Sequence, residues 1–122
     1  MIRGTVNARR QPVVPLVIRG PGGAEVSVEA LLDTGHNGAL TLPPEQIAFL
    51  GLPQRRTVSV SLADGSSAAL PVYQATVFWD GSERNTRVIA AGSQPIPGMS
   101  LTLGHKITVE MVDGGAVAVE RL

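Results

Sequence analysis

Glycine and proline divide this chain into short segments, and that division constrains its fold more than any other feature. The 122 residues include 14 glycines and nine prolines. Most of the intervening segments are rich in valine, threonine and isoleucine rather than in helix formers, which is typical of strands bounded by turns. With 43% hydrophobic residues, a chain of this length can bury one core but hardly two. We therefore predict a single all-β domain over residues 1–122.

Four glycine-containing turns mark the expected hairpins. The run Gly20-Pro21-Gly22-Gly23 separates β-prone segments 13–19 and 24–32, because glycine accepts positive φ and proline fixes its own φ. Asp-Gly pairs, which favour tight hairpins, stand at positions 64–65, 80–81 and 113–114. They predict strands over residues 57–62, 68–79, 84–90, 106–111 and 116–121. In 106–111 the apolar residues alternate with polar ones at period two.

Helices are expected in only two short segments. Residues 44–50 begin with Pro44, whose missing N–H costs nothing at the first helical position. Gly51 follows, where it can end the helix in a left-handed cap, and Leu52 is then expected to pack back on the helix. A second helical turn falls near residues 99–103, where proline, glycine and threonine lower the helix propensity.

Charge, cysteine content and hydropathy exclude several classes of function. Ten acidic residues balance ten basic ones and aromatic residues make up only 3% of the chain, so neither a basic field nor stacking platforms attract nucleic acid. Cysteine is absent and there are two histidines, which leaves no thiol nucleophile and no histidine-rich metal site. No signal peptide or membrane span of roughly 18 apolar residues is evident. We expect a cytoplasmic protein with no metal, organic cofactor, nucleic-acid partner or membrane partner.

The tripeptide Asp33-Thr34-Gly35 is the feature with the clearest chemical meaning. It follows the apolar run Ala30-Leu31-Leu32, so a carboxylate stands immediately after the end of an expected strand. Aspartate, threonine and glycine also form ordinary turns after strands. A tripeptide of this kind should occur by chance in roughly one chain in twenty of this length. The tripeptide alone therefore does not separate a catalytic carboxylate from a turn.

The order of motifs around this tripeptide resembles that of the retropepsin-like (clan AA) aspartic peptidases, single-domain relatives of pepsin that act as homodimers. An apolar strand delivers Asp-Thr-Gly at residues 31–35, and a hairpin with its tip at residues 63–66 lies where the family has its flap. Ile96-Pro97-Gly98-Met99 stands where the family has two apolar residues and a glycine before a short helix. Order and spacing agree over nearly the whole chain. Residues 31–40 are similar to small bacterial members of the family.

The resemblance implies a retropepsin-like closed β-barrel or sandwich with a flap hairpin, one or two short helices and a homodimeric assembly. It assigns catalysis to Asp33, a hydrogen-bonded grip between two active-site loops to Thr34, and close backbone approach behind the carboxylate to Gly35. The residues expected to contact a peptide or protein substrate follow the catalytic glycine or form the flap tip: His36, Asn37, Ala63, Asp64, Gly65 and Ser66.

Physical chemistry explains why one such motif requires two chains. Aspartic peptidases use two carboxylates about 3 Å apart that share one proton, because like charges so close cannot both ionise. The other candidates, Asp64, Asp80 and Asp113, are each followed directly by glycine and read as hairpin turns. The second carboxylate must then come from Asp33 of another copy, related by a twofold axis. We expect an aspartic endopeptidase that is active as a homodimer.

Two other functions fit parts of the sequence. A non-catalytic dimeric domain of the same fold would serve binding or oligomerisation, because a fold does not fix a function. A small β-barrel binding module unrelated to peptidases would tolerate replacement of Asp33.

Three departures from the family pattern are also present. His36 stands where relatives have an apolar or small residue and either faces the catalytic carboxylates or lies on the loop surface. Pro97 and residues 100–102 weaken the second helix, and the terminal segments that interleave in viral dimers are not recognisable. His105, for which no partner is evident, is expected to be solvated.

Overall fold

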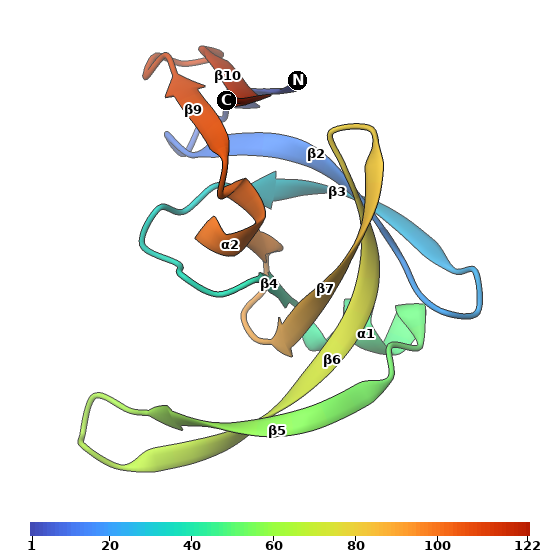
Figure 1. Cartoon of the computed structure of the whole chain (residues 1–122). Coiled ribbons are helices and arrows are strands. Elements are labelled where there is room, and N and C mark those ends of the chain that lie inside the picture. The colour runs from blue at the N-terminus through green and yellow to red at the C-terminus, as the bar shows by residue number, and fades with distance from the viewer.

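A computed structural model of the chain describes residues 1–122 and contains ten strands and two short helices (Figure 1). The strands of the first half are β1 (Ile2–Val6), β2 (Pro12–Arg19), β3 (Glu25–Leu31), β4 (Leu40–Leu42) and β5 (Gln54–Ser61). Those of the second half are β6 (Ser67–Trp79), β7 (Ser82–Ala90), β8 (Ile96–Pro97), β9 (His105–Val109) and β10 (Ala116–Arg121). The helices are α1 (Pro44–Leu50) and α2 (Met99–Thr102). The predicted all-β class is confirmed.

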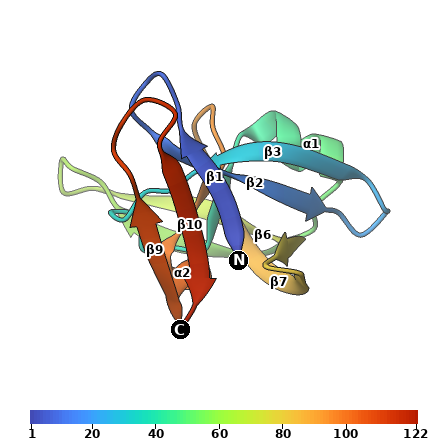
Figure 2. The same cartoon turned by 90° about the horizontal axis from the view of Figure 1, so that it is seen from above.

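All ten strands belong to one sheet that does not close on itself. Its main path runs β8-β4-β7-β6-β2-β1-β10-β9, with β3 paired to β2 and β5 paired to β6. Most pairs are antiparallel, and β4 with β7 is parallel. Because β1, β10 and β9 extend the sheet beyond β2 instead of returning to β8, the expected closed barrel is corrected to an open sheet. Figure 2 shows these three strands as a ribbon beside the β2–β3 hairpin.

Buried apolar side chains form one core cluster of 18 residues. Alternation along β2 places Leu16 and Ile18 inside it, and alternation along β6 does the same for Val77 and Trp79. The strand register sets Ile18 directly opposite Val77. Burial of side chains of this size stabilises a fold by about 1.5–3 kcal/mol each, so the core side chains reinforce the pairing of β2 with β6.

Local sequence accounts for α1. The helix spans the predicted residues with Pro44 at its start, and Gly51 ends it in the left-handed conformation with φ 62° and ψ 38°. The N–H of Leu52 then donates to the carbonyl of Ile47 at 3.3 Å. Leu52 is buried in the core cluster, so the helix, its cap and the return of the chain are all confirmed. No helix of the chain is long and apolar enough to cross a membrane.

The predicted Asp-Gly turns lie at the ends of hairpins. Between β6 and β7, Asp80 and Gly81 have φ values of 51° and 80°, the pair of positive φ angles that matches the twist of the flanking strands. Gly65 between β5 and β6 and Gly114 between β9 and β10 also have positive φ. Positive φ is favourable for glycine, which explains why these pairs locate the turns.

His105 is not solvated, and that prediction was wrong. The residue is half-buried at the start of β9. Its ring meets the ring of Trp79 edge-on with 6.0 Å between the centroids, and its Nδ1 lies 3.2 Å from the carbonyl oxygen of Leu103. The contact joins the end of β6 to β9, two strands that are distant in the sequence.

Candidate active site

Asp33 lies two residues after the end of β3, where the chain leaves the sheet. The N–H of Leu31 donates to the carbonyl of Pro95 at 2.9 Å, and the N–H of Leu32 donates to the carbonyl of Pro12 at 3.0 Å. Leu32 is buried, whereas Asp33 is exposed. Hydrogen bonds and burial therefore fix the residues before the carboxylate and leave the carboxylate open to solvent.

A tight turn orients the carboxylate of Asp33. The N–H of Gly35 donates to Asp33 Oδ1 at 2.9 Å, and the N–H of His36 donates to the Asp33 carbonyl at 3.1 Å. A Cβ atom at position 35 would lie 3.2 Å from Asp33 Oδ1, so glycine leaves room for the backbone to approach this oxygen. Thr34 is exposed and its hydroxyl makes no hydrogen bond within the chain.

The segment that enters α2 supports the far end of this loop. The N–H of Met99 donates to the carbonyl of His36 at 2.8 Å, and Ser100 Oγ donates to the carbonyl of Gly38 at 2.8 Å. Gly98 is buried and packs so closely that an added Cβ would overlap the Gly38 carbonyl. The predicted helical turn is present as α2, and it begins where these contacts are made.

His36 is held against the loop and is not a freely solvated side chain. It is half-buried, and its Nε2 lies 3.2 Å from Thr41 Oγ1. The ring also packs on Gly38, where an added Cβ would lie 3.2 Å from His36 Cε1. Asn37, in contrast, is exposed and its side chain makes no hydrogen bond in the chain.

The hairpin of β5 and β6 occupies the place where a flap was predicted. Its strands pair from Gln54↔Tyr73 to Ser61↔Ser67. Figure 1 shows its tip and the β3–β4 loop projecting from the same side of the molecule. The four flap-tip residues of the prediction, Ala63, Asp64, Gly65 and Ser66, are exposed in this tip.

Ser66 closes the turn at the hairpin tip. Its hydroxyl and its backbone N–H both donate to Asp64 Oδ1, the latter at 2.9 Å. The side-chain hydrogen bond, followed by the backbone one, lowers the pKa of Asp64 below its ordinary value because both favour the ionised carboxylate.

Replacing Ser66 with alanine should raise the pKa of Asp64 toward its ordinary value. A carboxylate with a lowered folded-state pKa stabilises the turn fully above its ordinary pKa, and this stabilisation is lost as the pH falls through the lowered pKa. The wild-type turn should therefore persist to more acidic pH than the Ser66→Ala turn. Carbon NMR titration of the Asp64 carboxyl measures the shift, with Ser67→Ala as the control because that hydroxyl makes no hydrogen bond. The same Asp64 pKa in all three proteins would contradict the assignment.

A pocket of about 170 Å³ opens between the β3–β4 loop and the base of the hairpin. It is lined by residues of the loop, of β4, of both hairpin strands and of β7: His36, Gly38, Ala39, Leu40, Arg56, Val58, Val72, Arg87 and Ile89. Among the predicted site residues it includes only His36. Asp33 and Asn37 lie outside its lining, as do the four flap-tip residues. Arg56 and Arg87 were not predicted, although Arg56 shares the alternation of Val58 and Val60 along β5.

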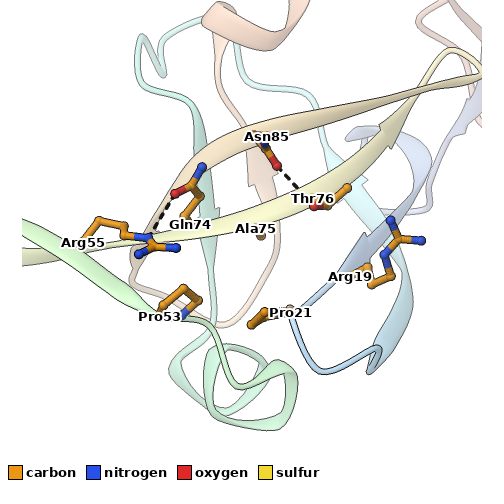
Figure 3. Close-up of a pocket in the computed structure, with 8 residues that line it drawn as sticks. All are labelled: Arg19, Pro21, Pro53, Arg55, Gln74, Ala75, Thr76 and Asn85. Carbon is orange, nitrogen blue, oxygen red and sulfur yellow. Dashed lines mark hydrogen bonds between the residues drawn. The ribbon is translucent and has the colours of Figure 1, made fainter.

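A second hollow lies on another part of the sheet and contains no predicted site residue (Figure 3). Its two arginines already have partners in the chain. Arg19 donates to Glu83 at 2.8 Å, and Arg55 Nε donates to Gln74 Oε1 at 3.1 Å. This hollow therefore has no uncommitted charged group, and the loop side of the molecule remains the candidate site.

No protein-family model matches the chain, and neither does any curated protein. Among solved structures, the chain is similar to the solution structure of Simian Foamy Virus (mac) protease, with a TM-score of 0.52. The similarity covers 73% of this chain and 91% of the viral chain at 21% sequence identity. It concerns the course of the backbone, and it agrees with the fold predicted from the motifs around Asp33. The chain has a retropepsin-like fold.

Proposed function

We propose that this protein is an aspartic endopeptidase that hydrolyses peptide bonds as a homodimer. The observation that carries the proposal is the exposed carboxylate of Asp33, held by the N–H of Gly35 at the end of a strand in a retropepsin-like fold. The other acidic residues considered, Asp64, Asp80 and Asp113, lie in or beside hairpin turns. One chain therefore supplies one carboxylate of this kind, and the second comes from the partner.

The two Asp33 carboxylates share one proton across the twofold axis of the dimer. The ionised carboxylate accepts a proton from the water that attacks the peptide carbonyl, and the protonated carboxylate donates to the developing oxyanion. Protons then pass to the leaving amine. Each Gly35 N–H fixes the orientation of its carboxylate. The hydroxyl of Thr34 has no partner in its own chain and is free to bond across the axis.

The β5–β6 hairpin closes over the bound peptide in this proposal. Closure excludes water, and backbone groups at residues 63–66 hydrogen bond to an extended substrate. His36 and Asn37 flank the substrate on the loop side. The enzyme consists of one domain, works without metal or organic cofactor, and acts on peptides or proteins in the cytoplasm. The proposal includes the small bacterial type of the family, which residues 31–40 resemble in sequence.

A diverse peptide library, incubated at about pH 3 to 8 with wild type and with Asp33→Asn, tests the proposal. Only the wild type should cleave, with a bell-shaped pH profile because the pair works only while it shares one proton. Peptide isosteres that carry a hydroxyl should inhibit, since they resemble the tetrahedral intermediate, and chelators should have no effect. Cleavage by Asp33→Asn would contradict the mechanism. No cleavage by either protein would favour the non-catalytic dimeric domain.

A further inference from the structure

Arg56 of β5 and Arg87 of β7 line the same pocket beside the β3–β4 loop. The register explains why they converge. Arg56 is paired with Val72 of β6, and Val72 is paired with Ile89 of β7. Side chains two residues apart on a strand point to the same face, so Arg87 lies on the face of Ile89. The two arginines thus line one pocket from neighbouring rows of the sheet.

Neither guanidinium is neutralised by the chain. No residue that lines the pocket is acidic. Arg56 and Arg87 take part in none of the ion pairs, and neither donates a side-chain hydrogen bond. Arg55, the adjacent residue of β5, lines the hollow of Figure 3 instead and is bonded to Gln74. Of these neighbouring arginines, Arg56 and Arg87 are thus the ones whose side chains have no partner in the chain and line the pocket beside the loop.

The other walls of the pocket are mostly apolar, with Val58, Val72 and Ile89 among them. Its volume of about 170 Å³ lies below the roughly 300–1,000 Å³ of pockets that enclose whole small molecules. The pocket therefore suits one side chain with an apolar stem and an anionic end. Arginine binds carboxylates well because its planar fork matches two oxygens.

We propose that this pocket binds the side chain of a glutamate in the peptide substrate, with the methylene groups against Val58 and Ile89 and the carboxylate on Arg56 and Arg87. The inference rests on the proposed function, because the pocket lies beside the loop that carries Asp33. An isologous dimer contains the pocket twice. The preference for glutamate then falls at two substrate positions, one on each side of the cleaved bond.

Peptides that differ only by glutamate or glutamine test this preference, with both chain ends blocked so that the side chain provides the varied charge. At about pH 6 a peptide glutamate is ionised, and kcat/KM of the wild type should be about tenfold higher for the glutamate peptide. The ratio should decrease as salt screens the charges. In the Arg56→Gln/Arg87→Gln double variant the ratio should fall to about one.

Arg55→Gln is the matched control, because it removes the same charge one residue away from a side chain outside the pocket; its ratio should equal that of the wild type. Charge reversal with Arg56→Glu and Arg87→Glu should move the preference from glutamate to lysine. A glutamate preference that survives in the double variant would overturn the proposal.

Calorimetric binding to Asp33→Asn separates this inference from the proposed function, since binding needs no cleavage. Tighter binding of the glutamate peptide, without cleavage by wild type, would support the proposed glutamate-binding pocket and refute the peptidase. Equal binding and equal cleavage of the two peptides would refute the pocket and leave the peptidase standing. A glutamine peptide with a free C-terminus that binds as tightly as the blocked glutamate peptide would identify the chain end as the ligand and overturn the side-chain assignment.

Discussion

Mixing wild-type chains with Asp33→Asn chains in equal amounts should reduce peptidase activity per total dimer to about a quarter of the wild-type value. In the proposed homodimer each active site needs Asp33 from both partners, and an amide cannot replace the acid–base function of a carboxylate. Random pairing makes roughly one dimer in four wild type on both sides. A series of mixing ratios should show activity rising with the square of the wild-type fraction.

Subunit exchange must be complete for this result to be interpreted, which fluorescently labelled chains can verify. Asp113→Asn is the matched control, because it removes a carboxylate from the turn between β9 and β10 and outside the proposed site. Mixing with that variant should leave activity at the wild-type level. A linear dependence on the wild-type fraction, after exchange has been verified, would show that each chain works alone.

Gly98→Ala should lower the free energy of unfolding by about 3 kcal/mol and abolish activity. The new Cβ would overlap the carbonyl of Gly38, and this backbone cannot move aside without breaking hydrogen bonds to Met99 and Ser100. For a domain of this size the melting temperature should fall by about 10 °C. Chemical denaturation and thermal melting measure the two effects.

Gly22→Ala provides the matched control. This glycine is exposed, lies in the turn between β2 and β3, and has nothing within 4 Å of an added Cβ. Its substitution should change the free energy of unfolding by no more than about 0.5 kcal/mol. If Gly98→Ala were equally neutral, the segment that enters α2 would not pack against the loop as described.

The elements that could be predicted are those whose signals act within a few residues. Proline and glycine bound α1 at residues 44 and 51, and its limits match the prediction. The Asp-Gly pairs located three hairpin turns because positive φ is a local requirement. The strand at residues 116–121 was predicted to its ends for the same reason, since a turn precedes it and alternation follows.

Elements that depend on distant partners were missed. β1, β4 and β8 contain five, three and two residues, too few to show a period. β4 forms because β7 and β8 pair with it on either side. The residues next to Leu40 in the sequence do not indicate either pairing. Closure of the sheet was predicted wrongly for a related reason, because which edges meet depends on the whole path of strands.

The candidate site likewise contains residues that could be predicted from the sequence and residues that could not. Asp33, Thr34 and Gly35 are contiguous, so the sequence displays them together. Arg56 and Arg87 come from different strands, and only the register of β5, β6 and β7 reveals that they share a pocket. The contact between His105 and Trp79 was hidden for the same reason.

The pairing of β1 with β10 determines when this part of the sheet can form during synthesis of the chain. β1 has four paired positions on β10, from Ile2↔Val119 to Thr5↔Ala116, and two on β2. At about 5–20 residues per second of synthesis, β1 waits roughly 5 to 20 s for its main partner. The loop that carries Asp33 waits similarly for Met99 and Ser100, which hold its far end. A growing chain on the ribosome therefore cannot assemble the loop of the candidate site until residues 99 and 100 have been synthesised.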